Sequence, residues 1–165
     1  MSGELIEVLR EKIRLLDRMQ SHLNFSQSDV RIWWRVDAPF DRWNDQQLVS
    51  LAALKARFAE LQDHLASAMI VVASIENQDT RVFTYVLNYM TQIGVLDDIG
   101  DWQKIRDLRN AATHDYTEPD AIKAQHFDQL LQQADFLYAV LCKLKHFVSL
   151  TYPEGIKDVS KNSKS

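Results

Sequence analysis

Residues 44–75, NDQQLVSLAALKARFAELQDHLASAMIVVASI, decide how this chain folds. Apolar residues recur there at steps of three and four, which places them on one face of a helix. They are Leu48, Leu51, Leu54, Phe58, Leu61 and Leu65. Asn44 and Gln47 have the spacing of a capping box and predict the first turn. At ~1.5 Å per residue, a helix from there to about Ile75 would cross a whole small domain.

The same periodicity predicts a first helix upstream of this segment. Its apolar positions are Leu5, Leu9, Ile13, Leu16, Met19 and Leu23. We expect a break after Leu23, because residues 24–44 are richer in Ser and Asp and contain Pro39. Within that segment a short helix is expected around residues 30–36.

A third helix is expected to begin at a cap, Asn77 or Asp79, and to stop at Gly94. Its inward positions are Val82, Phe83, Val86, Leu87, Met90 and Ile93. Asp101 is a suitable cap for a fourth helix, which carries Trp102, Ile105 and Leu108. A fifth begins near Pro119, since proline is tolerated at the first helical position. Its apolar positions are Phe127, Leu130, Leu131, Ala134, Leu137, Leu141, Leu144 and Val148.

These patterns predict an all-α fold. Runs with the two-residue period of strands and internal repeats are both missing from the sequence. We therefore expect an antiparallel up-and-down bundle of four long helices plus one helix that bears a polar motif. With 165 residues, 46% of them hydrophobic, the chain can bury the core of one domain, residues 1–150. Residues 151–165 become rich in Lys and Ser and are expected to form a disordered tail.

The charge and the single cysteine restrict the function. A formal net charge of -4 excludes a generally basic protein that coats nucleic acid, so any anion site must be local. Cys142 is the only cysteine; it cannot form an internal disulfide and is expected to be a core thiol in a reducing compartment. The sequence shows neither a signal-peptide core nor an apolar run typical of a membrane span. We expect a soluble, cytoplasmic protein with no membrane partner.

Residues 109–116, RNAATHDY, have the composition of a functional site. Arginine, asparagine, histidine and tyrosine are costly to bury unpaired, and all four occur here within one helical segment. On an ideal helix Asn110 and His114 are neighbours, and Arg109 and Tyr116 share a face. Arg109 and His114 diverge by ~140°. A two-fold dimer would bring both groups to one cleft, because its interface duplicates every group.

Phosphodiester cleavage without a metal is the chemistry that suits this set. A histidine can take the proton of a ribose 2′-hydroxyl or return one to the leaving 5′-oxygen. An arginine stabilises the charge that builds on the phosphate oxygens, and an asparagine orients either partner. The set has no cage of oxygen ligands for a hard cation, which disfavours a two-metal nuclease. Neither a metal nor another cofactor is expected.

The run Arg109-x4-His114-x-Tyr116, with Asn110 directly after the arginine, resembles the signature of the HEPN superfamily. It is most similar to the HepT-like toxins that pair with a minimal nucleotidyltransferase antitoxin, as are residues 57–65 and 96–108. This resemblance implies a helical bundle, a homodimer whose motif helices face each other, and metal-independent ribonuclease activity. It implies that Arg109 and His114 are catalytic, that Asn110 assists them, and that the antitoxin adenylylates Tyr116.

Two other interpretations of the motif stay open. Related HEPN proteins are non-catalytic subunits that bind substrate or nucleotide for a nucleotidyltransferase, so this chain could bind without cleaving. The motif could also be a cluster at a helix end that satisfies local charges in a helical adaptor. Asp63, on the second helix, could support the cleft, although a solvated surface residue is the favoured interpretation.

Three other features have a simple structural interpretation. Residues 31–36 and 42–43 interleave tryptophans with arginines, as a stacking surface for single-stranded RNA would, but packing of the rings onto the bundle is favoured. Glu60 and His64 lie one turn apart, yet a di-iron bundle needs Glu-x-x-His pairs on facing helices, so a metal site is disfavoured. The remaining histidines are expected to be at the surface or half-buried; they are His22, His126 and His146.

Overall fold

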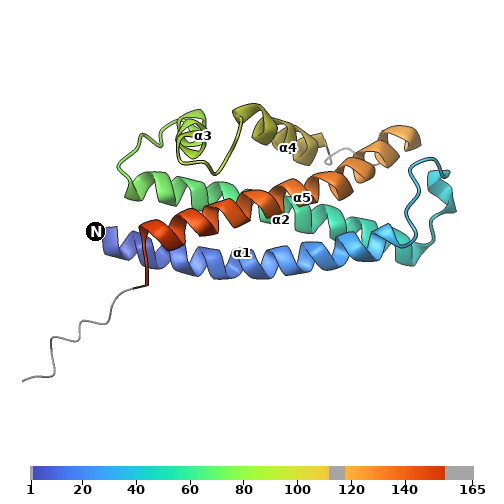
Figure 1. Cartoon of the computed structure of the whole chain (residues 1–165). Coiled ribbons are helices and arrows are strands. Elements are labelled where there is room, and N and C mark those ends of the chain that lie inside the picture. Colours follow the sequence, from blue (N-terminus) through green and yellow to red (C-terminus); the bar gives the residue numbers. More distant parts are fainter. Residues whose placement is uncertain (1, 112–117, 155–165) are drawn as a thin grey trace, which may run out of the picture.

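The computed structural model describes residues 2–111 and 118–154, and these residues form helices without any strand. The elements are α1 (Ser2–Arg31), a short 3₁₀ helix η1 (Phe40–Arg42), α2 (Asp45–Ile75), α3 (Phe83–Gln92), α4 (Ile99–Ala111) and α5 (Asp120–Thr151). The prediction of an all-α helical bundle is therefore confirmed (Figure 1).

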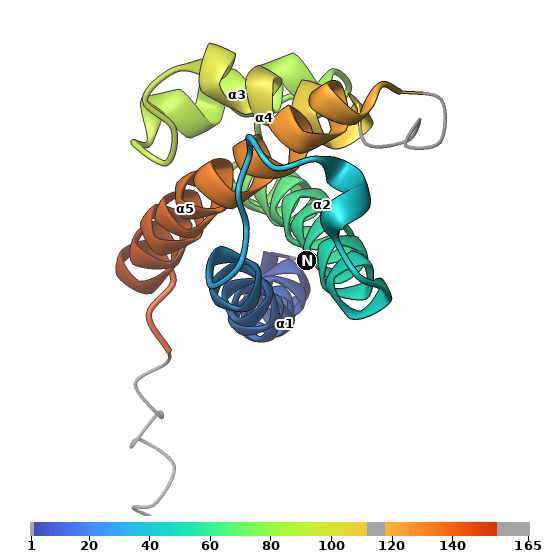
Figure 2. The ribbon, with the colours of Figure 1, turned by 90° about the vertical axis from the view of Figure 1, so that its right-hand side faces the viewer.

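The helices are arranged in three layers (Figure 2). Helix α1 forms one side, α2 and α5 form the middle, and α3 and α4 cover the opposite side. Helix α1 runs antiparallel to α2, since Lys12 near its start donates to Ser67 near the end of α2. It is also antiparallel to α5, because Lys145 pairs with Asp17. Helix α4 carries the chain back along the bundle before α5 begins (Figure 1).

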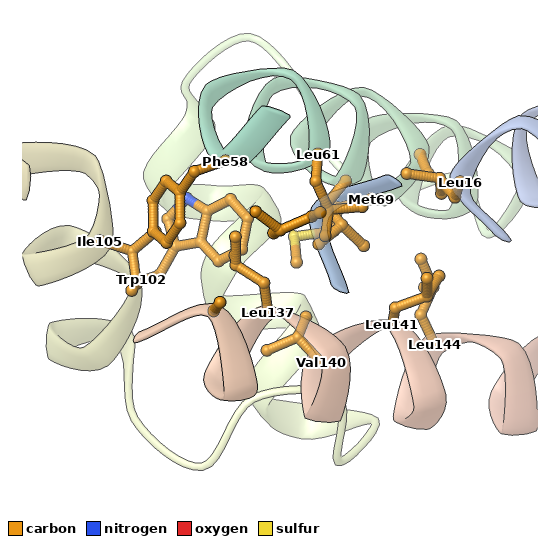
Figure 3. Close-up of a cluster of buried hydrophobic side chains, with 14 of the residues drawn as sticks. Leu16, Phe58, Leu61, Met69, Trp102, Ile105, Leu137, Val140, Leu141 and Leu144 are labelled. Carbon is orange, nitrogen blue, oxygen red and sulfur yellow. The ribbon is translucent and has the colours of Figure 1, made fainter. Parts of the chain in front are cut away.

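Helix α2 is the centre of the core and contacts all four other α-helices. Phe58 of α2 packs against Trp102 and Ile105 of α4, with Leu137 of α5 beside them (Figure 3). The capping box at Asn44 and Gln47 is present with both reciprocal hydrogen bonds, as the sequence predicts. By length and composition α2 could also cross a membrane, and 44% of its most apolar 18-residue window is buried inside the bundle. Leu48, Val49 and Ile70 of this helix are exposed.

The prediction that the first helix breaks after Leu23 is wrong. Helix α1 continues to Arg31, so the helix expected around residues 30–36 does not form as a separate element. The serine and glutamine that resemble loop composition are buried instead: Ser26 accepts a hydrogen bond from Arg57, and Gln27 donates to the carbonyl of Leu131. Because α2 and α5 supply these partners, polar residues are accommodated within the helix.

The expectation of four long helices is also wrong, since α3 has only 10 residues and three helices are long. Asp79 does not cap α3; its carboxylate accepts hydrogen bonds from the backbone and the side chain of Arg81, which keeps this segment outside the helix. Val82 is the N-cap and is exposed. Gly94, with φ of 80°, ends the helix as predicted, because this conformation favours glycine.

Helices α4 and α5 differ from the predictions at their ends. Helix α4 begins at Ile99, so Asp101 lies in the first turn and is not the cap. Pro119 is the N-cap of α5 and not its first helical residue. Helix α5 runs to Thr151, one residue past the expected domain boundary at residue 150, and the Tyr152 hydroxyl donates to Glu76. Residues 155–165 of the expected tail lie outside the described residues.

The tryptophans pack onto the bundle, as favoured. Trp34 stacks on Trp43 with 5.5 Å between ring centroids, and its indole N–H donates to Asp128 of α5. Trp33 contacts both rings. Cys142, in contrast, is exposed and is not the core thiol that the sequence suggested. Leu141 and Leu144 are buried on the core side of α5, whereas Cys142 lies on its solvent side.

Candidate functional site

The structure describes two of the four predicted site residues. Arg109 and Asn110 lie in the last turn of α4, which ends at Ala111. His114 and Tyr116 fall within residues 112–117, outside the described part of the chain. Arg109 and Asn110 can therefore be placed within the fold, whereas the convergence of Arg109 with His114 stays a prediction.

One face of α4 packs into the core, and the neighbouring strip of its surface lies toward α2. Trp102, Ile105 and Leu108 recur every three residues and are buried, and they fix the rotation of the helix. Trp102, Arg106 and Arg109 are spaced by four and three residues and share a face. This face lies toward α2, where all three line one pocket.

Asp63 of α2 holds Arg109 in place. A terminal guanidinium nitrogen of Arg109 lies 3.0 Å from a carboxylate oxygen of Asp63. Asp63 is exposed, with 52% of its side chain accessible, as the favoured interpretation expects, and it also pairs with Arg109. A pair this exposed contributes less than about 1 kcal/mol to stability, so its main effect is to orient the arginine.

The guanidinium of Arg109 keeps capacity for an anion. Its single described contact uses one of the five donors of the group. The Nε atom is buried and has no hydrogen-bond partner among the residues that the structure describes. Arginine binds a phosphate through two parallel N–H donors, so an anion that reached this edge would satisfy a donor that the protein leaves unpaired.

A pocket of about 400 Å³ lies between α2 and α4 beside this pair. Its polar wall combines Gln62, Asp63, Arg106, Arg109 and Asn110, and Phe83 and Ile70 contribute apolar surface. Two arginines face one carboxylate, which makes the charged part of the wall locally positive on an otherwise acidic chain. An anion bound at this wall would meet the condition set by the net charge, that any anion site on this chain must be local.

Gln62 is a residue of this pocket that the sequence patterns did not single out. Its side chain is only 4% exposed, and its Oε1 atom has no hydrogen-bond partner within residues 2–111 and 118–154. A buried acceptor without a partner costs about 1–3 kcal/mol, and such groups are rare in folded proteins. The available signal was its position: Gln62 lies four residues after Phe58 and three before Leu65, so it is a polar residue on the apolar face of α2.

A second pocket, of about 580 Å³, lies on the other side of α4, between α4 and α5. Lys104, Asp107 and His126 line it together with glutamines of α5. The His126 ring is half-buried against Phe127, with 5.8 Å between centroids. Helix α4 thus separates two pockets, and the motif begins in its last turn.

Residues 2–111 and 118–154 contain no group of three or more His, Cys, Asp or Glu side chains arranged to hold a metal ion. Glu60 and His64 are both exposed. His22 and His146 are exposed as well, in agreement with the sequence prediction.

Comparison with protein-family models, curated proteins and solved structures gave no match to this chain. The resemblance to the HEPN superfamily therefore depends on the motif at residues 109–116. The helical bundle is consistent with that resemblance but is shared by many unrelated proteins.

Proposed function

We propose that this chain is a metal-independent endoribonuclease, the cytoplasmic toxin of a toxin–antitoxin pair. The observation that carries the proposal is the state of Arg109: it is oriented by Asp63 at the edge of a pocket, retains an unpaired Nε donor, and lies five residues before His114. An arginine positioned in this way is suited to bind the phosphate of an RNA strand.

The reaction follows from the two side chains. The His114 imidazole removes the proton of a ribose 2′-hydroxyl, and the resulting oxygen attacks the adjacent phosphorus. The bond from phosphorus to the 5′-oxygen breaks, and that oxygen receives a proton from a second histidine or from water. Arg109 stabilises the charge on the non-bridging oxygens, while Asn110 orients the substrate. The products carry a 2′,3′-cyclic phosphate and a 5′-hydroxyl.

A homodimer completes this site. Arg109 faces α2 of its own subunit, and on a continuous helix His114 would point ~140° away from it. Two copies related by a two-fold axis place the arginine of one subunit opposite the histidine of the other. Each dimer then contains two composite sites.

Cleavage of RNA by the purified chain in excess EDTA tests the reaction. We expect cleavage, with cyclic phosphate and 5′-hydroxyl ends, and loss of activity in His114→Ala without a change in helix content. A requirement for magnesium, or equal degradation of DNA, which lacks the 2′-hydroxyl, would contradict the mechanism.

Mixing inactive subunits tests the dimer. If Arg109 and His114 act across the interface, a mixed dimer of Arg109→Ala and His114→Ala subunits has one site with both groups, and partial activity returns. Light scattering should give about twice the chain mass. An active monomer at micromolar concentration would refute the composite site.

We propose that a nucleotidyltransferase antitoxin silences the enzyme at Tyr116. The phenol oxygen attacks the α-phosphorus of ATP, pyrophosphate leaves, and the attached adenylate adds negative charge and bulk beside the arginine. Tyr116→Phe should remain active yet resist this antitoxin in the presence of ATP. Mass spectrometry that finds no adduct on Tyr116 after co-expression would exclude this regulation.

The alternative function is a non-catalytic subunit that binds substrate or nucleotide for a nucleotidyltransferase. The observation in its favour is the pocket itself, which offers arginines and an unpaired amide independently of His114. Nucleotide binding by the wild-type chain, without cleavage under any of the conditions above, would favour this alternative.

A further inference from the structure

The pocket between α2 and α4 contains a buried carboxamide without a protein partner. Gln62 is 4% exposed, and its Oε1 atom accepts no hydrogen bond. Buried side-chain amides are almost always bonded to protein or to ordered water, so an unpaired one in a pocket wall indicates a group that arrives with a ligand.

The neighbours of Gln62 restrict the chemistry of that ligand. Arg106 and Arg109 supply positive charge, and Asp63 supplies a carboxylate acceptor next to the amide. Phe83 and Ile70 provide an apolar wall. A flat group that has hydrogen-bonding atoms on one edge, and that is attached to a phosphate, fits all three features. A nucleotide is such a group.

The donors and acceptors favour adenine among the four bases. A carboxamide presents one donor and one acceptor in a plane, the pattern that pairs with the N6 amino group and N7 of adenine. The Asp63 carboxylate attracts the amino group that lies beside N7 of adenine, whereas it repels the carbonyl oxygens of uracil and the O6 atom that takes this position in guanine. The amino group of guanine lies on a different edge of the base. Cytosine also carries an amino group, but its smaller ring leaves more of the apolar wall uncovered.

We propose that Gln62 recognises the base of an adenosine in RNA, at the nucleotide whose phosphate contacts Arg109. Because the amide oxygen accepts no hydrogen bond from the described residues, it is available to the edge of the base. The enzyme would then cleave beside adenosine in preference to other nucleotides. The cleavage preference rests on the proposed function, whereas recognition of the base does not.

Binding is tested first, on the full chain and without cleavage. The probes are the four ribonucleoside 5′-monophosphates and ribose 5-phosphate. Titration calorimetry measures the binding of each. We expect AMP to bind about tenfold tighter than UMP or GMP, and Gln62→Met to lose this difference, because methionine has a similar size but cannot form the paired hydrogen bonds.

A buried glutamine elsewhere in the bundle provides the matched control. Gln27 is 2% exposed but is fully hydrogen-bonded. We expect Gln27→Met to lower the melting temperature and to leave the preference for AMP intact. Gln62→Met should melt at or above the wild-type temperature, since it removes an unpaired buried acceptor. A clear decrease in the melting temperature of Gln62→Met would assign the residue to the fold and overturn the proposal.

RNA oligonucleotides that place each base in turn next to a single cleavable phosphate complete the test. Preferred cleavage beside adenosine, lost in Gln62→Met, is the expected result. Cleavage that ignores the base, or an unchanged preference in Gln62→Met, would overturn the proposal and leave the ribonuclease standing. Preferential binding of AMP by a chain that cleaves nothing would refute the ribonuclease alone. If the chain prefers AMP among the free nucleotides but shows no preference for adenosine within RNA, the proposed recognition of adenosine in RNA is overturned.

Discussion

Two buried glutamines show how the same side chain serves two regions of this molecule. Gln27 of α1 donates to the carbonyl oxygen of Leu131 at 2.7 Å and accepts from the hydroxyl of Tyr138 at 3.1 Å. Gln62 of α2 is equally buried, yet its oxygen has no partner. Gln27, Tyr138 and the Leu131 carbonyl form a polar cluster between α1 and α5, which we call the saturated cluster because its groups are hydrogen-bonded to one another. This cluster stabilises the fold, whereas the pocket between α2 and α4 keeps an acceptor that a ligand can use.

The largest expected difference between the two regions is in activity. Arg109→Ala should lower cleavage by about 10²- to 10³-fold, the usual cost of removing a group that stabilises transition-state charge. Its effect on the free energy of unfolding should stay below about 1 kcal/mol, because the lost ion pair is exposed. Single-turnover cleavage and urea unfolding measure the two effects. Arg106→Ala, in the same pocket, is the control and should lose less activity.

The converse result is expected for the saturated cluster. Gln27→Met should lower the free energy of unfolding by about 2–3 kcal/mol, since it leaves the Leu131 carbonyl and the Tyr138 hydroxyl without their partner. Cleavage per folded molecule should be unchanged. Urea denaturation is the measurement. Equal loss of stability in Gln62→Met would remove the distinction between the two glutamines.

Substitution of Asp63 tests whether its ion pair orients Arg109 without contributing much to the stability of the fold. Asp63→Ala should reduce cleavage by about tenfold, because it frees the Arg109 side chain from its oriented position. Stability should change by only a few tenths of a kcal/mol for so exposed a pair. Asp63→Asn keeps an acceptor and should restore part of the rate. A rate for Asp63→Ala equal to wild type would show that this contact does not position the arginine.

The smallest effect is the response of the saturated cluster to alkaline pH. Burial, and then the nearby Asp135 carboxylate, raise the pKa of Tyr138, while Arg31 opposes them. The native state therefore holds this proton more tightly than the unfolded state. Its contribution to stability is complete below about pH 10, the ordinary pKa of tyrosine, and is lost as the pH rises further. Tyr138→Phe should make this decline shallower in urea unfolding at several pH values; an identical slope would contradict it.

Local periodicity was enough to predict the helices, but it could not predict contacts between them. The capping box at Asn44 and the glycine stop at Gly94 depend on neighbouring residues, and both are as expected. The extension of α1 through Gln27 depends on a carbonyl 104 residues away. No pattern in sequence alone indicates such a partner, so the composition of residues 24–44 predicts a break after Leu23.

The candidate site shows the same difference between local patterns and long-range contacts. Arg109 and Asn110 were found from their motif, because all its members lie within one segment. The contribution of Asp63 depends on a contact 46 residues away in sequence. Gln62 was detectable as a polar residue on an apolar stripe, but only the structure shows that it is unpaired and lines the same pocket as Arg109.

Helix α4 also gives the molecule a graded local stability. Three buried side chains attach its 13 residues to the bundle, whereas α1, α2 and α5 are each more than twice as long and interlock along their length. Sub-global opening of α4 therefore costs less free energy than complete unfolding, and its amides should exchange with deuterium earlier than those of α2. Each opening carries Arg109 away from Asp63 while the three long helices stay folded. A protein that captured α4 in the open form would inhibit the site without occupying it.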